Sequence, residues 1–544
     1  MKHARLLFCF VVLAVCEVTG LRAAAGEPVT IGNRRELFVD DFLVERLVGR
    51  AVLQMKHPVP AEVVLETSEP WEGNGTNYVT VFQEAGKYRM YYRGTHYSYL
   101  KGKDRPNHRD VYCYAESADG IHWTKPQLGL FDWDGSKKNN IVIDGTGRHA
   151  FAPFRDSNPT CAPDAIYKAI GWSGPEKGLY AFKSADGVRW SLMSPDPVIT
   201  EGAFDSLNLA FWDATKGEYR SYHRDFRNDG ATDLILSGID RGRDIKTSHS
   251  SDFVHWAKPE FLSYTANVEL GRPQAAGAQG KLPEGYPAGR VSELYTNQIM
   301  PYYRAPHLLL GFPTRYTDRG WTESAKLLPR PDYRVVRATS PEDKRPEGSR
   351  REGTAVTDGM FMTSRDRSHF SIWPESFLRP GLRTHDTWFY GDMYQNWGMV
   401  ETRSAIQDAP PEISIYVTER TLQETGAAIR RYTLRIDGFA SLHAPLVGGE
   451  LVTKPVIFGG DKLAVNFSTS AVGSVRIELQ DAEGRPLPGF SLEECHEIYG
   501  DDLERTVGWQ KLPSLASLAG RPVRLRFALK DADLYSFQFV KGPP

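Results

Sequence analysis

Five carboxylic acids in this chain each stand two to five residues before an asparagine. Carboxyl groups held close together raise one another's pKa, so that one stays protonated while another is ionised. Cleavage of a glycosidic bond uses that pairing, with one carboxyl as the acid and the other as nucleophile or base. The pattern points to carbohydrate chemistry if the fold brings the acids together. The pairs are Glu72 with Asn77, Asp156 with Asn158, Asp205 with Asn208, Glu293 with Asn297 and Asp392 with Asn396.

Three of these acids are the candidates for the catalytic groups. We expect Asp156 to orient or stabilise, Asp205 to act as nucleophile or base, and Glu293 to act as the acid. The alternative at each site is that Asp and Asn begin strands because their side chains suit turns. Recurrence at five corresponding places favours a shared role, although duplication of a structural unit would also produce it.

Further polar and aromatic residues are expected to bind the substrate. Arginine is always charged and can hold a carboxylate or bind sulfate and uronate groups, and tryptophan can stack on a sugar ring. The ordinary alternatives are surface ion pairs for the arginines and core packing for the tryptophan. The predicted set is Trp71, Glu72, Asn77, Arg93, Arg155, Asn158, Asn208, Arg224, Asn297 and Asp392.

The composition and motifs argue against several other classes of protein. The formal net charge is −2, which gives no field to attract a nucleic acid backbone. The histidines are dispersed without metal-ligand spacing, so we expect no metal and no cofactor. The chain has no P-loop, dinucleotide-binding or GxSxG fingerprint. Cys113, Cys161 and Cys495 leave room for one disulfide, whose partners the sequence does not specify.

A motif of the form Ser-x-Asp-Gly-x-x-Trp recurs along the chain and indicates the elements that position these residues. Asp and Gly suit a tight turn, because Asp accepts hydrogen bonds from backbone N–H groups and Gly tolerates positive φ. A hairpin that recurs with the same turn chemistry is typical of a β-propeller blade. The copies span 117–123, 184–190 and 250–256 (the third without the glycine), with a weaker fourth at 364–370 and a degenerate fifth at 435–439.

Two alternating or aromatic strands come before the strand that enters each turn, and one more strand leaves the turn. Each unit therefore has four strands. The inner strands of a propeller line its central channel, and their first residues ring one mouth of it. The acids would therefore converge on one pocket. We count five blades, whose inner strands are predicted to begin near Asn77, Asn158, Asn208, Asn297 and Asn396.

The pattern changes after about residue 442, where short strands alternate apolar and polar residues and no Asp turn recurs. We predict an all-β chain with a five-bladed β-propeller over residues 26–441 and a C-terminal antiparallel β-sandwich over 442–544. Within the propeller, the segment 26–70 is expected to supply an early strand or to close the ring.

Residues 1–25 have the parts of a secretory signal peptide. Lys2 and Arg5 give a basic start, an apolar run extends over residues 6–15, and three alanines at 23–25 offer a cleavage site. The run is too short to span a bilayer as a helix, and no other segment is apolar enough to do so. We therefore expect a secreted or periplasmic protein without a membrane span.

In architecture, residues 30–544 resemble the five-bladed glycoside hydrolases of families 32 and 43, and family 32 joins a propeller to a C-terminal β-sandwich. Those enzymes carry acids on the innermost strands of their first three blades. Arg155-Asp156 is similar to the family's Arg-Asp-Pro element, which implies a stabilising role for Asp156. The chain departs from the family where residues 71–75 replace the nucleophile motif and Asp205 replaces a Glu-Cys acid element. These departures argue against fructan activity and indicate a distant relative.

The sequence thus predicts a secreted glycoside hydrolase that acts on a poly- or oligosaccharide. Two alternatives stay open: a non-catalytic carbohydrate-binding propeller, and a sialidase-like enzyme, which would need three convergent arginines. Carboxyl pairs about 5–10 Å apart would favour an enzyme. Acids neutralised by Arg93 or Arg224 would favour binding alone. The sequence does not specify an oligomeric state.

Overall fold

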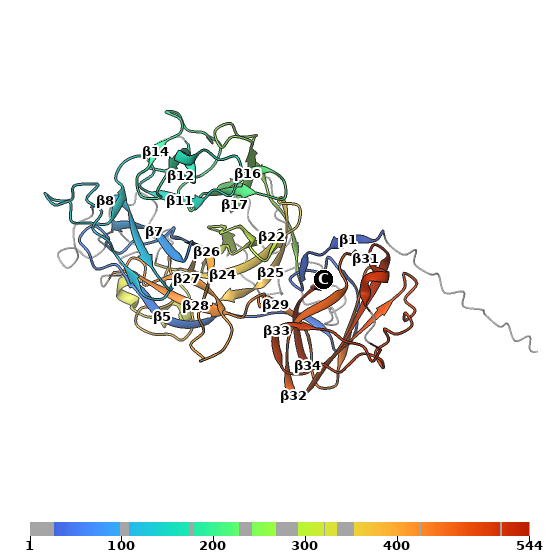
Figure 1. Ribbon diagram of the computed structural model, residues 1–544. Helices are drawn as coiled ribbons and strands as arrows, with labels where there is room; N and C mark the ends of the chain where they lie inside the picture. The colour runs from blue at the N-terminus through green and yellow to red at the C-terminus, as the bar shows by residue number, and fades with distance from the viewer. Residues whose placement is uncertain are drawn as a thin grey trace, which may run out of the picture.

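The chain folds almost entirely into β-strands, which form two bodies side by side in the computed structural model (Figure 1). One body is a set of sheets arranged around a common centre, and the other is a smaller β-sandwich. This confirms the predicted architecture of a β-propeller followed by a β-sandwich. The predicted signal peptide, residues 1–25, lies outside the described residues. The structure describes residues 27–97, 108–174, 178–227, 242–267, 292–319, 321–334, 353–423, 426–511 and 514–542.

Two sheets of the propeller each contain four antiparallel strands in sequence order. Their first strands pack against each other, because β15 lies beside β11. The first sheet comprises β11 (Ala150–Arg155), β12 (Tyr167–Trp172), β13 (Tyr180–Ser184) and β14 (Ser191–Leu192). The second comprises β15 (Leu209–Asp213), β16 (Glu218–Arg227), β17 (Gly242–Ser250) and β18 (Glu260–Phe261).

A nine-stranded sheet joins two antiparallel groups through one parallel pairing between Thr80 and Trp397. The early strand β5 pairs with β28, so part of the segment 26–70 joins the last propeller strands as the sequence predicts. One group comprises β6 (Thr80–Glu84), β7 (Lys87–His96), β8 (His108–Ser117), β9 (Trp123–Thr124) and β10 (Ile141–Ile143). The other comprises β26 (Tyr394–Thr402), β27 (Glu412–Glu419), β28 (Ala428–Leu434) and β5 (Val59–Glu66).

A seven-stranded sheet completes the described strands of the propeller. Strand β23, which begins at Thr314, extends this sheet by pairing with β20 and β24. The pairing groups the propeller strands into four sheets, one of them double, and the count of five blades stays a prediction. The strands are β19 (Ser263–Ala266), β20 (Ser292–Leu294), β21 (Met300–Tyr302), β22 (Ala305–Gly311), β23 (Thr314–Asp318), β24 (Ala355–Ser364) and β25 (His369–Leu378).

The predicted start of one inner strand needs correction. Strand β11 ends at Arg155, and Asp156 and Asn158 follow its last residue. The run Ala150–Phe154 is buried throughout and pairs with β12 over its full length, whereas Pro159 cannot donate a ladder hydrogen bond. The residue that precedes this strand is His149.

The repeated Asp turns form as the sequence predicts. In the first, the Ser117 hydroxyl accepts from the backbone N–H of Gly120 at 2.9 Å, and Asp119 Oδ1 accepts from two further N–H groups at 2.8 Å each. The same bonds recur around Asp186, Asp252 and Asp366. The turns connect β8 to β9, β13 to β14, β17 to β18 and β24 to β25, so the motif is scaffold.

The glycine position of these turns adopts positive φ in all four copies, even where the residue is Phe253 (φ 72°) or Arg367 (φ 84°). Both residues have compensating contacts. The Phe253 ring packs against Tyr219 at 5.1 Å, and the Arg367 guanidinium binds Asp213. The degenerate copy at 435–439 differs, because its Asp437 accepts from Tyr302 and Ser536 across the junction of the two bodies.

The β-sandwich combines strands from both ends of the chain. Figure 1 shows β1 beside the C-terminal strands, and β1 to β4 all pair within the ten-stranded sheet of the sandwich. The sequence predicts that the propeller begins at residue 26, but residues 29–55 belong to the sandwich. Their buried side chains, such as Phe38, pack on Phe527 and Phe537 of the C-terminal strands. The strands are β1 (Val29–Gly32), β2 (Arg35–Leu37), β3 (Val44–Gly49), β4 (Val52–Met55), β29 (Ala440–Ala444), β30 (Gly449–Thr453), β31 (Val456–Phe458), β32 (Lys462–Gln480), β33 (Asp501–Thr506) and β34 (Pro522–Val540).

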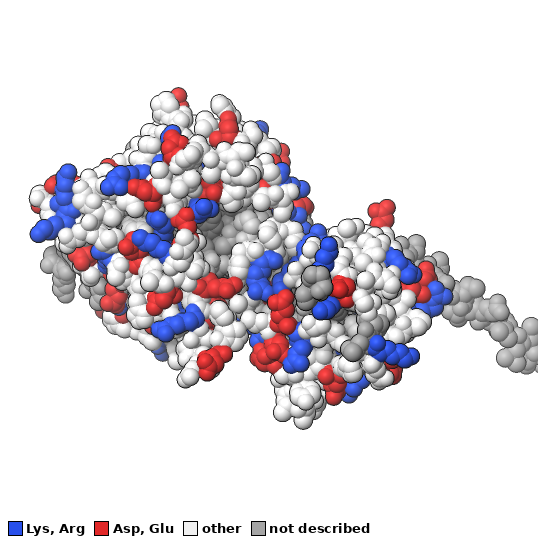
Figure 2. Space-filling model, in the orientation of Figure 1, with Lys and Arg blue, Asp and Glu red and all other residues white. Residues whose placement is uncertain are grey.

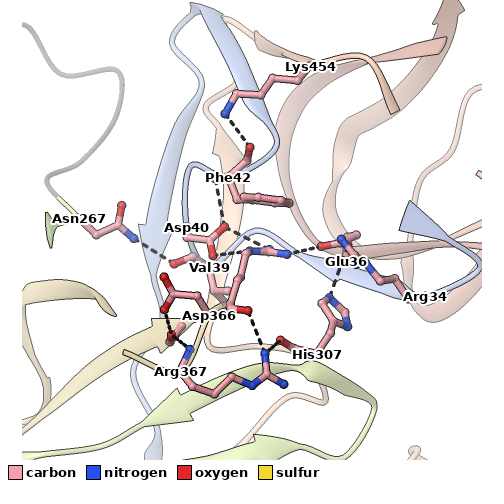
Figure 3. A network of polar contacts seen from close by, with 12 residues as sticks. Arg34, Glu36, Val39, Asp40, Phe42, Asn267, His307, Asp366, Arg367 and Lys454 are labelled. Carbon is pink, nitrogen blue, oxygen red and sulfur yellow. Dashed lines mark hydrogen bonds and ion pairs between the residues drawn. The ribbon is translucent and has the colours of Figure 1, made fainter. Parts of the chain in front are cut away.

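Buried ion pairs fasten the two bodies to each other (Figure 3). Arg365, in the fourth Asp turn, donates to Asp40 Oδ2 at 2.8 Å and to Glu36 Oε2 at 2.9 Å. Burial acts to raise the pKa of Glu36, but His307, Arg365 and Arg34 outweigh it and lower the pKa to about 2. A carboxylate held this way stays ionised, and it ties the propeller to the sandwich.

The surface carries charges of both signs. Figure 2 shows acidic and basic side chains interspersed over one face, with both gathered where the two bodies meet. Within the described ranges, no helix is long and apolar enough to cross a membrane. Cys113, Cys161 and Cys495 are free thiols, and the first and last of them are buried.

Candidate active site

His149 precedes β11 and joins three segments of the chain. Its Nδ1 lies 2.6 Å from Oδ2 of Asp110 on β8. Its Nε2 lies 3.2 Å from Oδ1 of Asp205, in the loop before β15. The ring stands edge-on to Trp172, with 5.1 Å between centroids. Because each ring nitrogen faces a carboxylate, the imidazole is fixed in orientation and a proton on either nitrogen has an acceptor.

Arg93 on β7 lies against this histidine and is only 4% exposed. Its Nη1 is 3.1 Å from Nε2 and 3.3 Å from Nδ1 of His149. Its Nε donates to the carbonyl of Gly75 at 3.0 Å, and its guanidinium lies over the Tyr78 ring at 5.0 Å. The carbonyl and the ring hold the guanidinium in one place, so the site has a fixed positive charge beside His149.

Asp205 is the accessible acid of this group. Its side chain is 58% exposed, whereas those of Asp110 and Glu293 are each 17% exposed. The Asn208 amide holds its loop by donating to the carbonyls on either side of Asp205, those of Phe204 at 2.8 Å and Ser206 at 3.0 Å. The loop before β15 therefore presents Asp205 outward in a defined position.

A second carboxylate, Glu293 on β20, lies against Arg243 on β17. Its Oε2 accepts from Arg243 Nη1 at 2.5 Å and from the Arg243 backbone N–H at 3.1 Å. The guanidinium groups of Arg243 and Arg224 lie over the same Tyr295 ring, at 5.0 and 5.2 Å. Arg224 Nη2 in turn lies 3.9 Å from Asp205 Oδ2. Two arginines and one tyrosine thus connect the two acids.

Tyrosines form a wall of the site. The hydroxyls of Tyr295 and Tyr390 are 2.7 Å apart, and the Tyr394 ring packs 5.7 Å from that of Tyr295. Burial raises the pKa of Tyr390 and of Tyr394 well above the usual value. Their phenols therefore stay protonated at neutral pH and act as neutral hydrogen-bonding groups.

The two carboxylates at His149 are both held in the ionised state. Burial acts to raise the pKa of Asp110, but the His149 hydrogen bond and the Arg93 charge lower it to about 2. At Asp205 the His149 hydrogen bond and the Arg224 charge likewise outweigh burial and lower the pKa. An ionised, exposed carboxylate suits a nucleophile or a general base rather than an acid.

Asp156 does not lie in this cluster. It stands beyond the end of β11 opposite to His149, and its side chain is fully buried. Its Oδ2 accepts from Lys168 and, at 2.7 Å, from the Tyr219 hydroxyl, and its Oδ1 accepts from the Asn158 backbone N–H at 2.9 Å. Its neighbour Arg155 is half-exposed and pairs with Glu84 at 2.6 Å. These contacts are structural, and the expected convergence of Asp156 with Asp205 is not observed.

Two predicted residues pack inside the first propeller unit. Glu72 is fully buried and accepts from Tyr92 at 2.5 Å and from Lys125 at 2.8 Å. Trp71 donates to Asn140 at 2.7 Å and packs on a hydrophobic cluster. With both Glu72 oxygens bound and no exposure, this acid is part of the scaffold.

The remaining predicted residues hold backbone around the site. Asn297 donates to the carbonyls of Leu207 and Tyr222, at 3.2 and 3.4 Å, and so ties two propeller units together. Asp392 accepts from the backbone N–H groups of Phe389 and Thr421 in the turn before β26. Asn77 precedes Tyr78 and is 8% exposed. Of the predicted set, Arg93, Asp205 and Arg224 lie together, and Glu293 lies at the edge of their group.

Sequence reasoning missed His149, Asp110 and Arg243. His149 directly precedes inner strand β11, at the position where the sequence pattern predicts an acid in each blade. A correct prediction of where β11 begins would have identified it. Asp110 and Arg243 each lie near the start of a later strand of their sheets, β8 and β17, and no local motif marks either of them. No group of three or more His, Cys, Asp or Glu side chains arranged to hold a metal ion occurs in the described part of the chain.

No known protein-family model matches the chain. Two curated relatives, uncharacterized proteins from the CDC 1551 and H37Rv strains of Mycobacterium tuberculosis, are each 27% identical over 187 residues. The match covers 33% of this chain and 51% of each relative. The chain thus spans about half the length of the curated relatives it matches.

Several solved structures are similar at low scores. A glycoside hydrolase gives a TM-score of 0.40 at 11% identity over 69% of this chain and 92% of its own. An N-acetylgalactosamine deacetylase from F. plautii gives 0.39 at 11% over 70% and 94%. A family 43 arabinoxylan arabinofuranohydrolase from Bacillus subtilis gives 0.36 at 11% over 87% and 97%. All three TM-scores lie below 0.5, so these likenesses carry no argument about function.

Proposed function

We propose that this protein is a carbohydrate-active enzyme that hydrolyses glycosidic bonds, with Asp205 as its nucleophile or base. The observation that carries the proposal is the state of Asp205: a 58% exposed carboxylate whose pKa is lowered by His149 and Arg224. Its loop is held at the entry of a propeller strand by Asn208. Glycoside hydrolysis needs such an ionised carboxylate on one side of the scissile bond.

The proton for the leaving oxygen must come from a group other than Asp205. Glu293 is the second carboxyl of the site, and we assign it the role of acid, which requires it to exchange its bond with Arg243 for a proton when substrate binds. His149 bridges Asp110 and Asp205, so it fixes the position of Asp205 and can accept the proton that Asp205 takes from water when it acts as a base. In this scheme Arg93 and Arg224 fix the positions of the imidazole and of Asp205.

The test is hydrolysis of a panel of polysaccharides and aryl glycosides by the wild type and three variants. Asp205→Asn and Glu293→Gln are expected to fold normally and to lose activity on the substrate that the wild type cleaves. Asp164→Asn is the matched control, because Asp164 is also an exposed acid (63%) in an ion pair, with Lys183 at 2.7 Å. Full activity in both site variants would overturn the assignment.

We also propose that residues 1–25 direct secretion of the protein. A basic start, an apolar run of ten residues and a cleavage site of small residues support this. Expression with and without residues 1–25, followed by N-terminal sequencing of the exported protein, tests it. A mature N-terminus near residue 26 is expected, and retention of residues 1–25 in the exported protein would contradict it.

A non-catalytic carbohydrate-binding propeller is the second candidate. The observation in its favour is charge neutralisation, because Glu293 is paired with Arg243 and Asp205 lies between Arg224 and His149. If the protein only binds glycans, glycan affinity should survive in Asp205→Asn, and the wild type should hydrolyse nothing in the panel.

A sialidase-like enzyme would use a tyrosine nucleophile. Arg93, Arg224 and Arg243 all lie around the site, as such an enzyme requires. Burial raises the pKa of Tyr78 and of Tyr390, which opposes a tyrosine nucleophile.

A further inference from the structure

Arg224 has an edge that the protein itself leaves without a hydrogen bond. Its Nε donates to the Ala203 carbonyl at 3.1 Å, and its guanidinium lies over the rings of Tyr295 and Phe226 at 5.2 and 5.6 Å. Its Nη1 is buried with no hydrogen-bond partner among the described residues. Its Nη2 lies 3.9 Å from Asp205 Oδ2, which is beyond hydrogen-bond distance.

An arrangement of this kind is costly unless something occupies it. A buried donor without an acceptor loses its hydration and gains nothing in return, and the loss is larger for a charged group. The residue is 3% exposed, and the carbonyl and two rings prevent its guanidinium from turning toward solvent. The guanidinium therefore keeps a fixed orientation, with Nη2 on the side of Asp205.

The neighbouring arginines differ from Arg224 in how their charges are met. Arg243 bonds Glu293 at 2.5 Å, and Arg93 bonds the Gly75 carbonyl and contacts His149. Among the arginines of the described site, Arg224 has an ion-pair partner only at 3.9 Å, and that partner, Asp205, is 58% exposed. A planar guanidinium edge in this state matches the two oxygens of a carboxylate, sulfate or phosphate group.

We propose that Arg224 binds an oxyanion carried by the sugar substrate, so that the site prefers acidic sugars over neutral ones. This rests on the proposed function, because it names the class of substrate for the same site. The oxyanion bonds Nη1 and Nη2 together. The uronate carboxylate and the sulfate ester share this chemistry.

The experiment measures binding rather than hydrolysis. Isothermal titration of the full chain with methyl glucuronide, methyl galacturonide, galactose 6-sulfate and neutral methyl galactoside compares the ligand classes. The acidic sugars are expected to bind at least about tenfold more tightly than the neutral one, and Arg224→Gln is expected to abolish that difference. The uronate and sulfate arms distinguish the two sources of the oxyanion.

Two further variants keep the outcome interpretable. Arg189→Gln is the control for the loss of an arginine, because Arg189 is 72% exposed and pairs with Asp186 at 2.8 Å in the turn between β13 and β14. Asp205→Asn removes the negative charge nearest to Arg224 and is expected to tighten binding of acidic sugars, a gain that a misfolded protein cannot show. Equal affinity for acidic and neutral sugars, or weaker acidic-sugar binding in Asp205→Asn, would overturn the proposal.

The results separate this inference from the proposed function. Arg224-dependent binding of acidic sugars without hydrolysis of any glycoside supports the inference and contradicts the enzyme. Hydrolysis of neutral glycosides with no preference for acidic ones supports the enzyme and contradicts the inference.

Discussion

Two acid clusters lie at opposite ends of β11, and they contain similar groups in different states. At the start of the strand, Asp205 meets His149 and is 58% exposed. Beyond its end, about 20 Å away by strand geometry, Asp156 meets Lys168 and is fully buried. An acid beside a basic side chain is therefore not enough to identify a site of chemistry.

The two acids differ in how many hydrogen bonds their carboxylate oxygens already accept from the protein. Asp156 accepts from Lys168, from the Tyr219 hydroxyl and from the Asn158 backbone N–H, so it has no solvent-facing oxygen to offer a substrate. Among the described residues Asp205 accepts only from His149, and its other ion pair, to Arg224, is 3.9 Å long. Saturated and buried acids hold the fold, whereas exposed and partly bound acids are available for reaction.

The largest expected effect follows from removal of the carboxylate at the exposed cluster. Asp205→Ala should lower kcat at least about 10³-fold, because a reacting group is lost. Its thermal unfolding midpoint should stay near that of the wild type. Added azide or formate should restore part of the rate if Asp205 is the nucleophile. Unchanged kcat in this variant would mean that Asp205, like Asp156, takes no part in the reaction.

The buried cluster should show the reverse pattern. Asp156→Asn should lower the free energy of unfolding by about 3–5 kcal/mol, because Lys168 is left as an uncompensated buried charge. Activity per folded molecule should be unchanged. Urea unfolding followed by tryptophan fluorescence measures the stability, and the double variant Asp156→Leu/Lys168→Met should recover most of it. A variant that is stable but inactive would place Asp156 back among the reacting groups.

His149→Gln tests whether the histidine sets the state of Asp205. Loss of a positioning and proton-holding group should lower kcat/KM about a hundredfold. Because the His149 hydrogen bond lowers the pKa of Asp205, its removal should raise that pKa toward the ordinary value. Asp205 acts while ionised, so the acidic limb of the pH profile should move to higher pH. A smaller kcat/KM with an unmoved acidic limb would indicate a purely structural histidine.

The smallest effect is expected beside the buried cluster. Arg155, which the sequence places among the substrate-binding residues, is 51% exposed and pairs with Glu84 at 2.6 Å. Exposed ion pairs contribute little, so Arg155→Ala should change the free energy of unfolding by less than about 1 kcal/mol. Glycan affinity and activity should match the wild type. A clear loss of glycan affinity in this variant would show that the far end of β11 also contacts substrate.

Much of the fold was predictable because its signals are local. The Asp turns depend on bonds between residues two or three positions apart, so Ser117, Asp119 and Gly120 indicate the turn without help from the rest of the chain. The strand class and the change of pattern near residue 442 follow from alternation in short segments. The register of β11 was harder, because Asp156 and Asn158 suit a strand start as well as a strand end.

The candidate site was predictable only in part for the same reason. Arg93, Asp205, Arg224 and Glu293 follow from residue type and position, and the structure places them near one another. The bonds that decide their chemistry join residues far apart: Asp110 to His149 spans 39 positions and His149 to Asp205 spans 56. No local pattern encodes such distances.

The sequence by itself therefore determined the repeated turns, the β-class of the chain and a pool of acids and arginines. The tertiary structure alone decided which acids became scaffold, which one stayed exposed, and that residues 29–55 complete the distant sandwich. The physical reason is that burial and bond saturation are properties of the packed chain. Asp156 and Asp205 are the same side chain, and only their surroundings make one of them structural and the other available to a substrate.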